Sequence, residues 1–588
     1  MRTEHPLKAY LTAGTIISSL GATTEENMRH IRAYRSGIRL LDDPALYEAP
    51  FMGARIERDE REGEADALSG YTRLERLFIA SLSGVIDRSG IDPTGADCLL
   101  ILSTTKGNID RLSADAPREA ILLSPMAQKV ADYFHLSHPP LVVSTACISG
   151  VSALIAAYRL VMEGRYRRVL VAGGDLLTRF VATGFQSFKS IGAERCRPYD
   201  KRRDGLSLGE ASGAVLVTAE RDDVRDHLPI VIEGGAVTND AHHISAPSRT
   251  GEGLRAAVLQ AMGEAGVQPG DISFVNAHGT ATVYNDEMES KAFHLSGLDA
   301  LPLNSLKPFW GHTLGASGVI ETVACMEELC SGEVFGTLGF EAAGTTYPLN
   351  LSDRHRSMPL RRCLKTASGF GGCNAAIVLA LEAEAKPHVK LPHVKLPPLQ
   401  AHLIRRCTVE RGRVVRDGTI IFHATGGEAF PSFIREAYAH LALDDRRFYK
   451  MDDLCKLGYI AAAYLLSGID WASRYKPEET GIILSNASSS LDTDIRHQQV
   501  IEALGDKEAS PAVFVYTLPN VVMGELCIRY NIRGENTFFI TPAYDPELIK
   551  RYALLAMKRQ KLQACLAGWC EYLDGHYCAQ LEWIERIK

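Results

Sequence analysis

A cysteine lies where the chain could form a nucleophile. Cys147 stands in Ser144-Thr-Ala-Cys-Ile-Ser-Gly150, between an apolar run at 141–143 and an apolar stretch of helical periodicity at 151–162. A thiol at the first turn of a buried helix faces the positive end of the helix dipole and nearby N–H groups, which lowers its pKa and favours the thiolate. The pattern predicts a reactive thiol, although a cysteine before a helix is more often a packed core residue.

Two histidines lie in similar motifs of small residues. His278 belongs to Val275-Asn-Ala-His-Gly-Thr-Ala-Thr282, and His312 belongs to Gly311-His-Thr-Leu-Gly-Ala-Ser-Gly318. Loops that meet strands and helices often carry functional groups. Either histidine alone is more often structural, but the conjunction predicts that Cys147, His278 and His312 share one site.

The elements that must hold these residues alternate between strand and helix. Residues 141–143 read as a strand, 151–162 as a buried helix and 169–172 as a second strand, and similar units recur around 274–275 and 315–329. This alternation predicts an α/β fold in which helices cover sheets.

Length and composition exclude several classes of protein. The 588 residues are 46% apolar and 23% charged, and the net charge of -7 comes without a basic block, so nucleic acid and anionic lipid are not expected partners. The 13 cysteines form no CxxC pair, which favours a reducing cytoplasm over a disulfide framework or a zinc site. No apolar run is long enough to predict a membrane span. Residues 1–22 are expected to form a buried strand and a turn rather than a targeting segment.

A duplicated unit punctuated by proline divides the chain. Pro387-His-Val-Lys-Leu-Pro-His-Val-Lys-Leu-Pro-Pro398 can continue neither a helix nor a central strand, so we expect an extended spacer over 385–400. Its two histidines are interpreted as part of the linker repeat and not as a metal site. The division leaves a body at 1–384 and a tail at 401–588.

The tail repeats part of the body in weakened form. The segment 74–92 matches 454–470 in spacing and apolar face, and the pattern of helix then strand at 159–173 has an echo at 552–568. These repeats indicate a duplicated domain half. Chance similarity between amphipathic helices is the alternative.

Five segments of the body share the order and approximate spacing of one family's motifs. They are Thr145–Gly150, Arg197–Gly205 with Gly209 and Glu210, His278–Thr282 with Asn285, Asp286 and Glu289, Lys307 with Gly311–Gly318 and Glu321, and Gly369–Asn374. Through them the body resembles the β-ketoacyl-(acyl carrier protein) synthases, the elongating Cys-His-His condensing enzymes of the thiolase-like superfamily. Initiating synthases pair the cysteine with His and Asn, and thiolases add a second catalytic cysteine. The resemblance implies a duplicated body with α-β-α-β-α layers, whose halves cover about 1–225 and 226–384.

The resemblance implies a role for each central residue. Cys147 would accept an acyl group as a thioester. The backbone N–H groups of Cys147 and Phe370 would form an oxyanion hole. His278 and His312 would hold a malonyl thioester carbonyl as neutral donors and assist the loss of carbon dioxide.

The resemblance also implies supporting residues. Lys307 would act electrostatically in the catalytic site, and Glu321 would anchor Lys307 or orient a histidine; surface positions are the alternative for both. Cys373 replaces the usual Thr of the Gly-Phe-Gly-Gly-x-Asn loop and is interpreted as a packed neighbour. Substrate binding is implied for Thr280, Thr282, Gly369, Phe370 and Gly371, of which Phe370 would gate the acyl pocket.

No metal and no cofactor is expected beyond the phosphopantetheine arm that carries the substrates. The resemblance implies an acyl carrier protein as partner, and a homodimer or a ketosynthase-type pseudo-dimer as the assembly. The cytoplasm is the expected location.

The tail resembles the N-terminal half of the same fold without its nucleophile. Residues 518–534 resemble the segment that precedes the nucleophile, but Pro542 or Ala543 falls where the cysteine is expected. The tail also lacks both histidine motifs, so it is expected to be catalytically inactive. Inactive partner subunits called chain-length factors suggest that the tail is a truncated subunit of that kind, docking on the body or on a second chain.

The implied function is therefore decarboxylative condensation of an acyl thioester with malonyl-acyl carrier protein, in fatty acid, polyketide or polyene synthesis. The segment 102–107 resembles synthases of aryl-polyene and flexirubin-type pathways. Two alternatives remain: a noncatalytic interaction protein of the chain-length-factor type, and a non-decarboxylating acyltransferase that needs only one of the two histidines.

Overall fold

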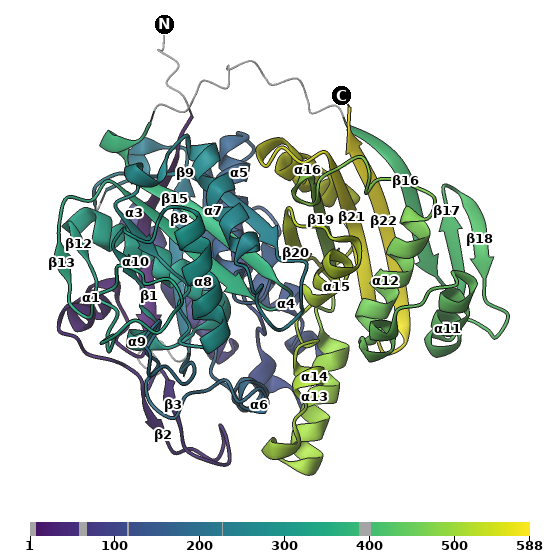
Figure 1. The fold of residues 1–588 in the computed structure, drawn as a ribbon, viewed down its shortest axis with the longest axis horizontal. Helices are drawn as coiled ribbons and strands as arrows, with labels where there is room; N and C mark the ends of the chain where they lie inside the picture. Colours follow the sequence, from purple (N-terminus) through teal and green to yellow (C-terminus); the bar gives the residue numbers. More distant parts are fainter. Residues whose placement is uncertain (1–6, 58–67, 114–116, 226, 387–400, 588) are drawn as a thin grey trace, which may run out of the picture.

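The computed structural model describes residues 7–57, 68–113, 117–225, 227–386 and 401–587. Two sheet-based units, the body and the tail, lie side by side in Figure 1. The predicted spacer falls almost wholly outside the described residues. No helix in the described ranges is long and apolar enough to cross a membrane.

The first sheet of the body has the order β1-β8-β6-β4-β5. The three strands β6, β4 and β5 are parallel, whereas β8 runs antiparallel to both β1 and β6. The apolar N-terminal segment forms the buried strand β1, as predicted. The strands are β1 (Ala9–Ser18), β4 (Cys98–Ser103), β5 (Leu141–Val143), β6 (Arg168–Asp175) and β8 (Ala211–Thr218).

The second sheet of the body has the order β9-β15-β14-β10-β11 and joins the first through a short β1–β9 pairing. These strands are β9 (Ile230–Asn239), β10 (Phe274–Asn276), β11 (Leu303–Asn304), β14 (Arg362–Gly369) and β15 (Cys373–Leu381).

Helices form the other layers of the body. Helices α5 (Ser149–Met162) and α10 (Ser317–Ser331) contact each other and strands of both sheets, so they form a central layer. Helix α3 (Arg73–Ser89) packs on the first sheet, while α7 (Glu252–Ala265) packs on the second and contacts α8 (Val283–Leu295). The predicted α/β class and the α-β-α-β-α layering are confirmed. The buried face of α5 explains its apolar sequence, since 13 of its 14 residues are buried.

The tail repeats the first sheet of the body. Its order is β20-β19-β21-β22-β16-β17-β18, with β20, β19 and β21 parallel and β22 and β16 following antiparallel. Strands β5, β4, β6, β8 and β1 have the same directions in the same order. The matched segments 74–92 and 454–470 lie mainly on helices α3 and α12. These helices precede the corresponding strands β4 and β19 in the chain. The strands are β16 (Ala401–Glu410), β17 (Arg413–Arg416), β18 (Thr419–His423), β19 (Thr480–Asn486), β20 (Asn536–Ile540), β21 (Ala564–Leu573) and β22 (His576–Arg586).

The remaining helices and strands connect these layers. In the tail they are α11 (Phe430–His440), α12 (Asp453–Leu466), α13 (Leu491–Leu504), α14 (Pro511–Phe514), α15 (Val521–Tyr530) and α16 (Pro546–Arg559). In the body they are α1 (Thr24–Arg32), β2 (Arg39–Leu41), β3 (Phe51–Ala54), α4 (Leu123–Tyr133), α6 (Arg179–Ser187), β7 (Leu208–Gly209), α9 (Lys307–Trp310), β12 (Glu333–Val334) and β13 (Arg356–Ser357).

The tail joins the body of its own chain through a pair of antiparallel strands. Phe539 of β20 pairs with Val143 of β5, and Ile540 pairs with Val142. This pairing makes the two sheets continuous, with β5 and β20 at the junction. Of the two docking modes expected from the sequence, the structure shows docking within one chain.

Candidate active site

The two central helices meet at a pair of glycines. A Cβ atom on Gly150 would lie 2.8 Å from the Cα of Gly318, and one on Gly318 would lie 2.4 Å from the backbone N of Val151. Neither residue can therefore be larger without moving a helix. This crossing places Cys147, two residues before α5, beside His312, five residues before α10.

Each helix start is fixed by a serine next to the glycine. Ser149 Oγ accepts a hydrogen bond from Thr145 N at 2.8 Å, and Ser317 Oγ accepts one from Thr313 N at 3.1 Å. The same four-residue spacing appears on both sides of the crossing. The Ser-Gly pair shared by the two motifs was the sequence signal for this symmetry, and sequence reasoning missed it.

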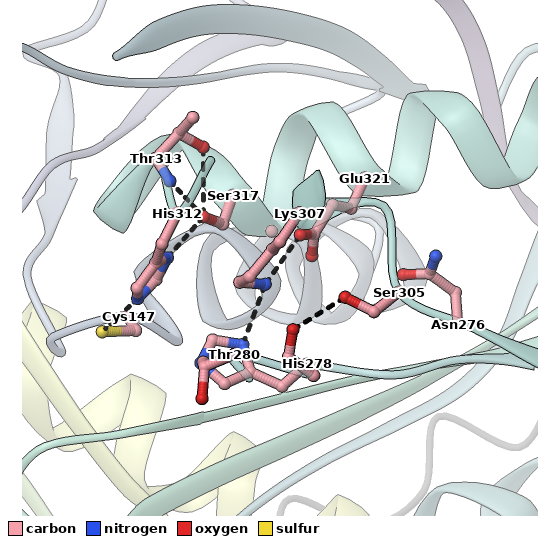
Figure 2. A network of polar contacts seen from close by, with 12 residues as sticks. Cys147, Asn276, His278, Thr280, Ser305, Lys307, His312, Thr313, Ser317 and Glu321 are labelled. Atoms are coloured by element: carbon pink, nitrogen blue, oxygen red, sulfur yellow. Dashed lines mark hydrogen bonds and ion pairs between the residues drawn. The ribbon is translucent and has the colours of Figure 1, made fainter. Parts of the chain in front are cut away.

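The nucleophile candidate faces a histidine and two backbone donors. Cys147 Sγ lies 3.1 Å from His312 Nε2 (Figure 2). The backbone N–H groups of Cys147 and Phe370 both approach the sulfur and favour its charged form. Ala146, with φ of +46°, turns the chain sharply between β5 and α5. The structure thus brings together the thiol and the two backbone donors that sequence reasoning assigned to acyl transfer, and it adds His312, which sequence reasoning assigned to the malonyl step.

The predicted low pKa of Cys147 is wrong. Burial raises the pKa of this thiol to about 12, although Lys307 and the two backbone donors act in the opposite direction. Part of the side chain still reaches solvent, but the surrounding protein excludes enough water to outweigh the helix end. At neutral pH Cys147 is a thiol, so a base must take its proton as it attacks.

His278 completes the group of three. Its ring lies edge-on to that of His312, with centroids 5.2 Å apart, and the ligand atoms of Cys147, His278 and His312 all lie within 4.8 Å of one another. Burial, followed by the positive charge of Lys307, lowers the pKa of both histidines well below 6.5. Both are therefore neutral imidazoles at pH 7, as the resemblance implied.

A buried row of charges stands behind the histidines. Lys307 Nζ lies 2.8 Å from Glu321 Oε1 and 3.4 Å from His278 Nδ1 (Figure 2). Because the ammonium group can only donate, it leaves the proton of neutral His278 on Nε2. Sequence reasoning placed both Lys307 and Glu321 here, and the structure does so too.

Sequence reasoning missed a second lysine. Lys365 Nζ lies 2.6 Å from Glu321 Oε2, and its side chain is fully buried. Burial alone would raise the pKa of Glu321, but Lys307 and Lys365 together lower it. The three groups form a buried Lys-Glu-Lys row with net positive charge. No local motif marks Lys365, which lies on β14 among apolar neighbours.

Two buried carboxylates shape the loop after β10. Glu289 accepts hydrogen bonds from the backbone of His278 and Gly279 at 2.9 and 2.7 Å, and Asp286 accepts one from Thr280 N at 3.1 Å. Thr280 Oγ1 lies 2.9 Å from Thr282 Oγ1, so the two hydroxyls face the same side of the loop.

The glycine loop between β14 and β15 lies against the nucleophile. A Cβ on Gly369 would stand 3.0 Å from Cys147 N, and Gly371 has φ of +88°. The Phe370 ring stacks on Phe185 with centroids 6.1 Å apart, which places an aromatic cluster beside the site. Cys373 is buried with its Sγ 3.2 Å from Phe370 O, so it is a packed neighbour, as interpreted.

No second site of this kind occurs in the described part of the tail. Strand β20 occupies the position of β5, but it runs into Thr541-Pro-Ala-Tyr-Asp545 before α16. Among the described residues, only Cys147, His278 and His312 form a group of three or more such ligand-type side chains.

A partly buried cysteine and two neutral histidines at the crossing of two central helices define a condensing enzyme of the thiolase-like fold. Two family models match the chain: the beta-ketoacyl synthase N-terminal domain over residues 12–223 and the C-terminal domain over residues 230–341. This chain belongs to the β-ketoacyl synthase family.

Curated relatives agree with this assignment. A putative polyketide beta-ketoacyl synthase 1 of Streptomyces halstedii is 35% identical over 328 residues, which cover 53% of this chain and 73% of the relative. The 3-oxoacyl-[acyl-carrier-protein] synthase 2 of Synechocystis sp. is 33% identical over 247 residues. That match covers 40% of this chain and 59% of the relative, so it spans less than two thirds of the cyanobacterial protein.

Solved structures extend the likeness. The ketosynthase ApeO in complex with its chain length factor ApeC, from Xenorhabdus doucetiae, matches at 25% identity with a TM-score of 0.57, covering 64% of this chain and 99% of the other. The PfaC keto synthase-chain length factor matches with a TM-score of 0.76 over 99% of this chain and 78% of the other. At 14% identity this second match concerns the fold alone, but it includes the tail.

Proposed function

We propose that this chain catalyses the decarboxylative condensation of an acyl thioester with a malonyl thioester, both carried by an acyl carrier protein. The observation that carries the proposal is the 3.1 Å contact between Cys147 Sγ and His312 Nε2, beside two backbone donors that approach the same sulfur. A thiol, a neutral base and an oxyanion hole are the parts that acyl transfer needs.

In the first half-reaction Cys147 attacks the acyl thioester. Its proton passes to His312 Nε2, and the N–H groups of Cys147 and Phe370 hold the oxyanion. The C–S bond to the carrier then breaks, and the carrier sulfur takes the proton from His312. The net change exchanges one thioester for another.

In the second half-reaction the malonyl carboxylate leaves as carbon dioxide, and its electron pair remains as an enolate. His278 donates a hydrogen bond from Nε2 to the enolate oxygen, because Lys307 faces its Nδ1 and leaves the proton on Nε2. Ser317 Oγ lies 3.2 Å from His312 Nδ1 and can donate or accept, which allows His312 to serve as base first and donor second. The enolate carbon attacks the acyl thioester, the C–S bond to Cys147 breaks, and the sulfur takes up a proton from solvent water.

The tail is proposed to act as a chain-length-factor-like half subunit fused to its ketosynthase, so that one chain supplies the ketosynthase and part of its pseudo-dimer partner. Its pairing through β20 and its lack of a nucleophile support this reading. The likeness to the putative polyketide beta-ketoacyl synthase 1 of Streptomyces halstedii supports a substrate of polyketide type. The proposed enzyme needs no cofactor other than the carrier's phosphopantetheine and is placed in the cytoplasm.

Mass spectrometry of the full chain after incubation with acyl carrier thioesters tests the proposal. We expect one acyl group on Cys147, none on Cys147→Ala, and carbon dioxide release without condensation from Cys147→Gln. Full condensing activity in Cys147→Ala would overturn the mechanism. Acylation without any carbon dioxide release would instead favour a non-decarboxylating acyltransferase.

A further inference from the structure

The tail contacts both loops that supply the proposed oxyanion hole. One loop, Ser144–Cys147, carries the N–H of Cys147, and the other, Gly369–Gly372, carries the N–H of Phe370. The tail reaches the first loop through β20 and the second through the start of α15. The active residues themselves all belong to the body.

Asn520 holds the second loop directly. Its Nδ2 donates a hydrogen bond to Phe370 O at 2.8 Å, and its side chain is almost wholly buried, at 1% exposure. This carbonyl belongs to the same residue whose N–H points at Cys147. The carbonyl and the N–H of Phe370 belong to the two peptide planes on either side of its Cα atom. Because the hydrogen bond to Asn520 fixes the first plane, it limits rotation of the second plane and so helps to fix the direction of the N–H.

Gly524, one turn further along α15, packs on the next residue of the loop. A Cβ on Gly524 would lie 2.8 Å from Gly371 O and 3.0 Å from Gly371 Cα. The same Gly371 O accepts a hydrogen bond from Asn239 Nδ2 at 2.8 Å. The loop is therefore held between β9 of the body and α15 of the tail.

The loop that carries Cys147 is held in a similar way. Ser144 N donates to Phe538 O at 3.1 Å, and Phe538 N donates to Thr145 Oγ1 at 3.3 Å. These bonds continue the pairing of β5 with β20 up to the turn at Ala146. Both donors of the oxyanion hole thus depend on tail residues for their backbone position.

We propose that the tail positions the oxyanion hole of the body, with Asn520 as the positioning residue for Phe370. The inference rests on the proposed function, because the hole matters only where an acyl oxyanion forms. It assigns the tail a part in the rate of acyl transfer, separate from any effect on product length. Asn520 touches no reacting atom, so its substitution leaves the three catalytic side chains in place.

Single-turnover acylation of the full chain tests the inference with Asn520→Ala and Asn520→Asp. Removing a whole oxyanion donor costs about 100- to 1000-fold in rate, so we expect misplacing one to slow acylation of Cys147 about 10- to 100-fold. Carbon dioxide release in a Cys147→Gln background should stay within about twofold, because the histidines hold that enolate. Gln498→Ala, which removes an exposed hydrogen bond to Glu502 on α13, is the tail control and should leave both rates unchanged.

The possible results distinguish a failure of the inference about the oxyanion hole from a failure of the proposed function. Wild-type acylation rates in both Asn520 variants would overturn the inference and leave the proposed function standing. Equal loss of acylation and decarboxylation, with a lowered melting temperature, would also overturn it, because it would show a purely structural role. No acylation of the wild-type chain would overturn the proposed function and the inference together. Gly524→Ala should slow acylation in the same selective way, and it provides a second substitution that does not involve Asn520.

Discussion

Arg159 of the body and Glu535 of the tail form a two-pronged ion pair that is completely shielded from solvent. Their side-chain atoms meet at 3.0 and 3.1 Å, and Tyr552 of α16 adds a further contact to the guanidinium at 3.1 Å. Arg159 lies on α5, the helix that begins beside Cys147, and Glu535 immediately precedes β20. The pair therefore ties the catalytic helix to the strand that joins the two sheets.

Breaking this pair should loosen the tail. Arg159→Met leaves Glu535 buried without its cation, a change that typically costs about 3–5 kcal/mol. We expect a loss of that size in urea unfolding, together with faster proteolysis of the tail. Lys507→Met removes an exposed ion pair with Glu48, which also joins the tail to the body, and should leave the free energy of unfolding nearly unchanged. A similar loss of unfolding free energy in both variants would contradict the claim that the buried pair stabilises the tail more than the exposed pair does.

The sequence predicted the body well because its site residues lie in dense local motifs. Cys147, His278 and His312 each sit among small residues whose close packing leaves a readable pattern. The strand and helix periodicities predicted the α/β class, and the family resemblance implied the layers. Lys365 and Asn520 were missed because each acts through a contact with a residue far away in the chain, within segments of ordinary composition. Local sequence carries no sign of such a pairing.

The pKa of Cys147 could not be predicted for a different reason. The start of a helix is visible in the sequence, whereas the water excluded by the surrounding fold is not. The local dipole favours the thiolate, but burial dominates. The docking of the tail on its own body depends likewise on the three-dimensional pairing of β20 with β5.

The helix crossing should tolerate no added methyl group. Gly150→Ala and Gly318→Ala each bring a Cβ within 2.8 Å of the facing backbone, so we expect a cost of about 1–3 kcal/mol in unfolding free energy. Because the crossing sets the distance from Cys147 to His312, acylation should fall in the fraction that remains folded.

Gly263 supplies the control for those two variants. It lies on α7 with open space where a Cβ would stand, so Gly263→Ala should raise stability by up to about 1 kcal/mol and leave acylation unchanged. Calorimetry and single-turnover acylation check both claims. Wild-type stability in Gly150→Ala would show that the helices can separate without cost.

Alkylation of Cys147 should report its raised pKa. The thiolate is the nucleophile, so with a pKa of about 12 the rate with iodoacetamide should rise about tenfold for each pH unit from 7 to 10. A free thiol of pKa about 8.5, such as glutathione measured in parallel, should level off within that range. Mass spectrometry of the peptide that carries Cys147 separates it from the other cysteines. A plateau by pH 9 would contradict the raised pKa.

Removing Lys365 should show how much its charge on Glu321 contributes to the free energy of unfolding. In Lys365→Met, Glu321 keeps one cation instead of two, so we expect a loss smaller than the cost of leaving a buried charge wholly unpaired, which is about 3–5 kcal/mol. Lys365→Arg keeps the charge and should recover part of that loss. Urea unfolding across a pH series measures both variants against the wild type.

The sign of the pH effect follows from the lowered pKa of Glu321. A carboxyl group whose folded pKa lies below its unfolded value of 4.5 contributes stability above that value and loses it as the pH falls through the folded pKa. The gap between wild type and Lys365→Met should therefore be full at pH 7 and shrink below pH 4.5. A gap that is constant down to pH 3 would show that Lys365 stabilises the fold by packing alone, without its charge on Glu321.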